Sequence, residues 1–70
     1  MHVIEMQIRK SMLDVGIKYE YQLAERLGMK RQTLAFRFKN PTTFTAGELL
    51  SMCHLFNWTD TELGGLIRSL

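Results

Sequence analysis

One short pattern occurs twice in this chain and restricts its fold more than any other feature. Residues 44–49 read FTAGEL and residues 58–63 read WTDTEL, so each copy runs aromatic, threonine, two spacers, glutamate, leucine. A threonine followed three residues later by a glutamate predicts a capping box at a helix start, and the flanking aromatic and leucine predict a hydrophobic staple. The two copies therefore predict two helices, one beginning near residue 46 and one near residue 60.

Apolar periodicity predicts three more helices before these two. Ile4, Ile8 and Met12 recur at four-residue spacing, and Leu34 and Phe38 are also four apart, as on one face of a helix. The expected helices cover about residues 3–14, 20–27, 31–39, 46–56 and 60–69. The sequence thus predicts a compact all-α fold of five helices, with residues 1–70 forming one domain and residues 40–43 a loop.

Composition removes several classes of function. A chain of 70 residues has a thin core and little room for a deep cleft. Cys53 is the only cysteine, so no intramolecular disulfide or cysteine pair for zinc is available, and we expect no metal, cofactor or small-molecule ligand. Paired carboxylates, a His–Cys dyad and a phosphate-binding glycine loop are all missing, so we do not expect an enzyme.

The chain also lacks the features of a secreted or membrane protein. No apolar run approaches the roughly 18 residues of a membrane span, and polar residues interrupt the first ten positions where a signal peptide would have its apolar region. A single cysteine suits a reducing compartment. We therefore expect a cytoplasmic protein that does not contact a membrane.

Basic residues gather in one stretch of the chain. No acidic residue occurs between Glu25 and Glu48. Clustered positive charge of this kind is typical of a surface that binds a polyanion, although a solvated basic face gives the same pattern. The basic residues of the stretch are Arg26, Lys30, Arg31, Arg37 and Lys39.

The helices predicted over residues 20–27 and 31–39 have the features of a DNA-reading pair. Gly28 can adopt the positive φ of a tight turn between them, and the small Ala24 allows the second helix to cross close over the first. Two helices joined by such a turn cross at about 90–120°, and the second can then lie in a major groove.

Here the sequence resembles a known family. Residues 23–34, LAERLGMKRQTL, look like the helix-turn-helix of the lambda repressor and Cro type, the xenobiotic-response-element-like superfamily. Residues 40–50, NPTTFTAGELL, resemble small prophage-type regulators of Gram-positive bacteria. The resemblance covers roughly residues 8–66 and implies a lambda-repressor-like domain that acts as a sequence-specific transcriptional regulator, encoded by a bacterium or a phage.

The resemblance also implies roles for individual residues. Lys30, Arg31 and Gln32 would open the recognition helix, where the family contacts base edges and phosphates. Chemistry supports this, because arginine can bind guanine and glutamine can bind adenine through two hydrogen bonds, each pair giving about 1–3 kcal/mol of discrimination. The remaining positions matched to DNA-contacting ones are Tyr21 and Gln22, then Thr33, Ala35, Phe36 and Lys39, and the loop residues Asn40, Thr42 and Thr43.

Two positions depart from the family pattern. Glu20 replaces the common glutamine at the start of the second helix, and because a carboxylate is repelled by phosphate, we expect it to turn away from DNA. Arg37 stands where an apolar residue is usual, so Phe38 is expected to supply the packing there.

Members of this family usually bind as dimers to inverted repeats whose half-sites lie about 34 Å apart. We therefore expect a homodimer on double-stranded DNA, with the last helix as its surface. Phe36 leaves a second hypothesis open, because its ring suits either thymine methyl groups or a protein partner, in which case the chain would be a phage-type adaptor or inhibitor. The residues expected at the dimer interface are Trp58, Leu63, Leu66, Ile67 and Leu70.

Overall fold

The computed structural model describes residues 3–70, which form five α-helices and contain no strand; Met1 and His2 lie outside the described residues. The predicted all-α class and the five predicted helices are confirmed. The bounds are α1 Val3–Asp14, α2 Glu20–Leu27, α3 Arg31–Lys39, α4 Ala46–Phe56 and α5 Asp60–Arg68. The expected loop after α3 contains a short 3-10 helix, η1, over Pro41–Thr43. Proline suits the first position of that turn because its fixed φ is already helical.

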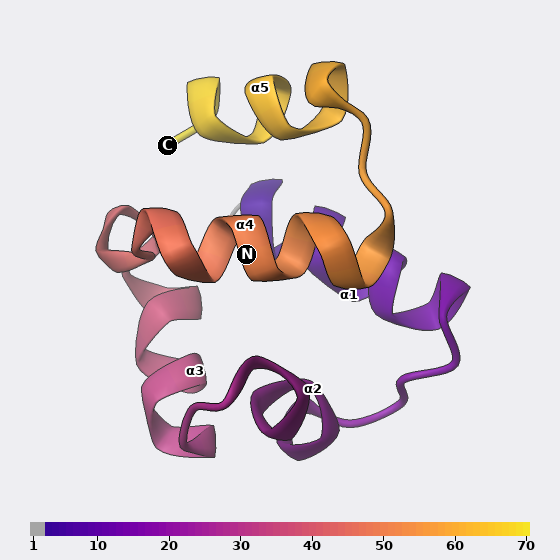
Figure 1. The fold of residues 1–70 in the computed structure, drawn as a ribbon. Helices are drawn as coiled ribbons and strands as arrows, with labels where there is room; N and C mark the ends of the chain where they lie inside the picture. The colour runs from indigo at the N-terminus through magenta and orange to yellow at the C-terminus, as the bar shows by residue number, and fades with distance from the viewer. Residues whose placement is uncertain (1–2) are drawn as a thin grey trace.

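The helices surround one hydrophobic core. In Figure 1, α4 crosses the middle of the molecule with α1 behind it, α5 lies above, and α2 and α3 lie below. The fully buried side chains Ile8, Leu23, Leu34 and Met52 come one each from the first four helices. The centre of the core is therefore formed jointly by α1, α2, α3 and α4.

Local signals in the sequence set the helix ends. The Thr45 hydroxyl accepts the backbone N–H of Glu48 at 3.1 Å, and the Glu48 carboxylate accepts the backbone N–H of Thr45 at 2.9 Å. Thr59 and Glu62 form the same pair of bonds at 3.1 and 3.0 Å. Both predicted capping boxes are confirmed.

Arg9 connects α1 to the next two helices. Its Nε donates to Glu5 at 2.8 Å, and its Nη2 donates to Glu20 at the start of α2. Its guanidinium carbon also lies 5.1 Å from the centroid of the Phe38 ring on α3, within the range of a cation–π interaction. Partial burial lowers the pKa of Arg9, but the hydrogen bonds and charges of the two glutamates outweigh it and leave that pKa raised.

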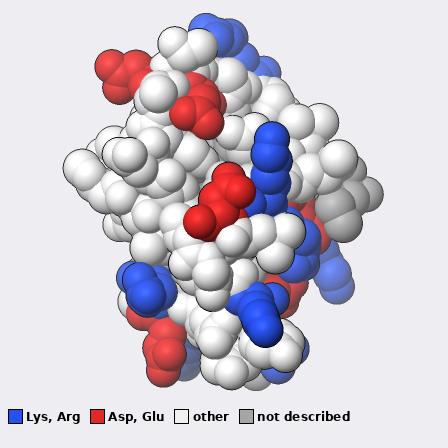
Figure 2. Space-filling view, turned by 90° about the vertical axis from the view of Figure 1, so that its right-hand side faces the viewer, with Lys and Arg blue, Asp and Glu red and all other residues white. Residues whose placement is uncertain are grey.

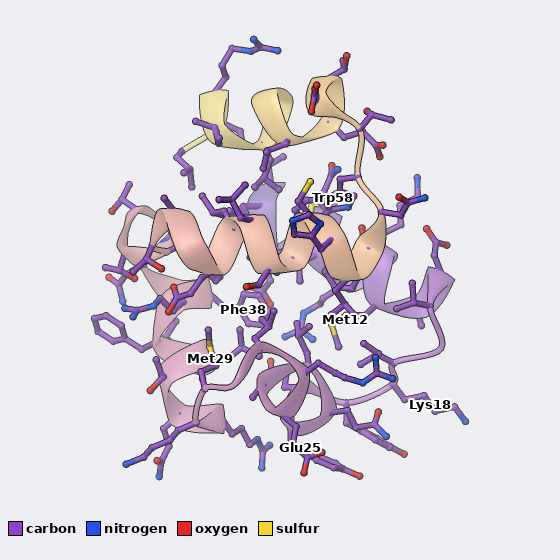
Figure 3. All side chains as sticks on the ribbon, viewed as in Figure 1. Met12, Lys18, Glu25, Met29, Phe38 and Trp58 are labelled. Atoms are coloured by element: carbon purple, nitrogen blue, oxygen red, sulfur yellow. The ribbon has the colours of Figure 1, made fainter. Side chains whose placement is uncertain are left out.

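Trp58 closes the core between α4 and α5. Its side chain is only 7% exposed, and its Nε1 donates to the Ser11 hydroxyl of α1 at 2.8 Å. Figure 3 shows Trp58 beside the C-terminal end of α4, while Met12, Met29 and Phe38 point into the space between α4 and the two helices below it. The predicted dimer role of Trp58 is therefore corrected, because the core of the single chain already covers its ring.

We predict that the Trp58–Ser11 bond contributes measurably to stability. Trp58→Phe leaves the Ser11 hydroxyl buried without its donor, which costs about 1–3 kcal/mol. Ser11→Ala should cost a similar amount, because it leaves the indole N–H unpaired. Urea unfolding of both single variants and the double variant should show a loss smaller than the sum; additive losses would mean that the two groups are not coupled.

Candidate nucleic-acid interface

Helix α3 presents two faces of opposite character. Leu34 and Phe38 are 0% and 3% exposed and hold the helix to the core. Gln32, Phe36 and Lys39 lie on the other face and are exposed, as expected from a rotation of about 100° per residue. The structure therefore brings these three predicted site residues together on the outward surface of α3.

The flanks of α3 hold the other predicted residues. Lys30 and Arg31 are exposed at its start, whereas Thr33 and Ala35 are half-buried beside the core face. Within residues 3–70, no side chain caps the N-terminus of α3. Its first backbone N–H groups therefore remain for water or for an anion, as at other uncapped helix starts.

Arg37 does not belong to the outward face. Its Nε and Nη2 donate to the two carboxylate oxygens of Glu48 at 3.0 and 3.3 Å, a two-bond ion pair with both side chains mostly buried. One oxygen of Glu48 also accepts the backbone N–H of Thr45. Phe38 provides the packing that Arg37 cannot, as predicted. Sequence reasoning missed the ion pair, and its only hint in the sequence was that Glu48 is the first acid after the basic stretch.

The start of α2 is ordered by Gln22 and by two tyrosines. The Gln22 side-chain oxygen accepts the backbone N–H groups of Lys18 and Tyr19 at 3.0 and 3.1 Å. This capping role was not predicted, and it leaves the Gln22 amide N–H₂ as a donor. Tyr21 is exposed and its ring stacks on that of Tyr19, with centroids 5.7 Å apart.

The loop after α3 is tied to its own backbone. The Asn40 amide donates to the carbonyl oxygen of Phe36 at 3.1 Å, and the Thr43 hydroxyl donates to the carbonyl oxygen of Asn40 at 2.6 Å. Thr42 is exposed between them. Of these three residues, Asn40 and Thr43 use side-chain donors to shape the loop, and Thr42 presents its hydroxyl to solvent.

Four basic residues near α3 form no ion pair with another described residue. Within residues 3–70 the ion pairs are those of Arg9 with Glu5 and Glu20 and that of Arg37 with Glu48. The cations left without an ion pair near α3 are Arg26, Lys30, Arg31 and Lys39. On the side of the molecule away from α3, basic and acidic side chains are interspersed (Figure 2).

The residues expected at a dimer interface divide into two groups. Leu66 is 4% exposed and lies in the core, like Trp58, and Leu63 packs against the core. The prediction for Leu66 is corrected, because α5 packs on α1 and buries this side chain within the single chain. Ile67 and Leu70 remain 49% and 39% exposed.

Among the described residues, no three His, Cys, Asp or Glu side chains are grouped so that they could hold a metal ion. No described helix has the length and apolar character needed to cross a bilayer.

Comparisons of this chain with family models, with curated proteins and with solved structures returned no match. The resemblance to the lambda repressor and Cro type therefore stays a prediction from the residues themselves.

We predict that the turn before α3 requires a backbone with positive φ at position 28, and that no steric constraint on the side chain adds to this requirement. Gly28 has φ of 70°, and a Cβ added to it would meet no atom within 4 Å. Gly28→Ala should therefore cost about 1–2 kcal/mol from conformation alone, measured by thermal unfolding. Gly28→Asn should cost less, because asparagine tolerates this region; equal losses would point to a steric cause.

We also predict that the Arg37–Glu48 pair can be separated from the helix cap. Glu48→Gln keeps an acceptor for the capping box but removes the charge, so it should cost about 1 kcal/mol. Arg37→Met should remove little further stability in the Glu48→Gln background. Urea unfolding of Glu48→Gln, Arg37→Met and the double variant measures this. If Arg37→Met costs as much stability in the Glu48→Gln background as it does alone, Arg37 acts through another contact.

Proposed function

We propose that this chain is a sequence-specific DNA-binding transcriptional regulator that reads the major groove with α3. The observation that carries the proposal is the outward surface of α3. It presents amide, basic and apolar side chains and no acid, while Leu34 and Phe38 anchor the helix from behind. The basic residues beside it have no ion-pair partner within residues 3–70.

The polar side chains on and beside α3 match chemical groups of DNA. The Arg31 guanidinium suits guanine O6 and N7, and the Gln32 amide suits adenine N6 and N7. Lys30 and Lys39, at the two ends of α3, suit phosphates on either side of the groove. Tyr21 and the free Gln22 donor, at the start of α2, suit a third phosphate.

We propose further that the protein binds an inverted repeat as a homodimer. A module of this size gains affinity when two copies bind half-sites about 34 Å apart. Ile67 and Leu70 support a surface on α5, since both are apolar and exposed. A Cro- or repressor-like role in a bacterial or phage cytoplasm belongs to the same proposal.

Selection from a pool of random double-stranded DNA tests the proposal most directly, and enrichment of an inverted repeat is the expected result. Affinity of the dimer for the selected site should fall by about 10⁴-fold between 50 and 200 mM salt if four cations of each of its two chains contact phosphates. Arg31→Ala should relax base preference at one position of the half-site. Lys10→Ala is the control, since Lys10 is an exposed basic residue on α1, outside both proposed surfaces; it should change neither affinity nor preference. The absence of any enriched sequence would contradict DNA reading.

A second candidate function is a protein-binding adaptor or inhibitor. The observation that favours it is Phe36, which is 52% exposed on an otherwise polar surface. A protein partner held through this ring would remain bound in high salt and would be lost with Phe36→Ala. DNA binding depends on salt instead, so a titration with sodium chloride separates the two functions.

A further inference from the structure

Phe36 lies at the outermost position of α3. Leu34 and Phe38 point into the core, and at about 100° per residue the middle of the opposite face falls on Phe36. Gln32 lies about 40° away from it on the same face. An apolar ring therefore stands where a helix lying in a major groove would reach deepest.

The backbone around Phe36 is held on all sides. Arg37 is paired with Glu48 of α4, and the ring of Phe38 packs edge-on against that of Phe44, with centroids 6.2 Å apart. Asn40 donates to the carbonyl oxygen of Phe36 itself. The backbone position of Phe36 is thus fixed by anchored neighbours, while the residue itself is 52% exposed.

Base edges offer one apolar group in the major groove, the C5-methyl of thymine; the other groups there are hydrogen-bond donors and acceptors. A phenyl ring gains from covering that methyl and loses from covering the edges of guanine, adenine or cytosine, whose polar groups it would leave unpaired. The amide of Gln32 matches adenine. The two residues are four apart, about 6 Å along the helix axis, which is less than two base steps of 3.4 Å.

We infer, on the basis of the DNA-binding function proposed above, that Gln32 and Phe36 together recognise a short A·T segment of each half-site. Gln32 binds the N6 and N7 atoms of an adenine, and Phe36 packs on the methyl group of a thymine within two base steps of it. Phe36 is in this way a specificity-determining residue, and the DNA class that it selects carries a thymine methyl at a defined position.

Replacement of thymine by deoxyuridine tests this directly, because it removes the methyl group and keeps the base pair. The full chain is first used to select a site from random duplex DNA. Each thymine of that site is then replaced in turn, and affinity is measured by fluorescence anisotropy at constant salt. One thymine per half-site should be sensitive, with binding weakened about fourfold in each half-site by the loss of a buried methyl.

Two variants and a control complete the experiment. Phe36→Ala should bind the unmodified site more weakly and show no further loss when the sensitive thymine is replaced. Gln32→Ala should relax the preference for an A·T pair within two base steps of that thymine. Leu50→Ala is the matched control, since Leu50 is also 52% exposed but lies on α4; it should keep the wild-type response. Circular dichroism confirms that each variant is folded.

The outcomes separate the role of Phe36 from the DNA-binding function itself. An enriched site that tolerates deoxyuridine at every thymine would overturn the role of Phe36 and leave DNA binding intact. Sensitivity that persists in Phe36→Ala would assign the methyl contact to another residue and overturn it equally. Failure to enrich any site would remove the DNA-binding function and this inference together.

Discussion

The arrangement of the candidate interface depends on Arg9. Its guanidinium binds Glu20 at the first position of α2 and lies over Phe38 near the end of α3, so one side chain of α1 contacts both helices and links them where they meet the core. Because Phe38 is fixed on the inner side, Phe36 is forced outward. The bond to Arg9 also occupies the carboxylate of Glu20, which would otherwise stand free at a helix start proposed to approach phosphate.

Glu48 performs the corresponding role on the other side of α3. Its carboxylate caps α4 and binds Arg37, so the start of one helix and the last turn of another share a single side chain. These bonds, together with those of Asn40 and Thr43, hold the segment that joins α3 to α4 and includes η1. Helix α3 is therefore anchored at its inner face by apolar contacts and along one flank by a charged pair.

Much of the fold could be predicted because its signals are local. A capping box spans three residues and a left-handed helix end depends on a single glycine or asparagine, so the helix bounds followed from the sequence. The errors concern contacts between distant residues. Trp58 binds Ser11, 47 positions away, and Arg37 binds Glu48, 11 positions away; neither spacing has a periodic signature. The outward face of α3 was predictable because Leu34 and Phe38 mark its inner face, whereas the burial of Leu66 required the position of α5 on α1.

The division of α3 into an anchored face and an outward face has a consequence for how such a protein can diversify. Gln32, Phe36 and Lys39 contribute little to the core, and substitutions at exposed positions of this kind usually change stability by less than about 0.5 kcal/mol. Descendants of this chain could therefore exchange these three side chains and acquire new targets while Leu34, Phe38 and Arg37 keep the scaffold unchanged. Stability and target choice depend on different residues of the same nine-residue helix. Selection can therefore change the target without lowering the stability.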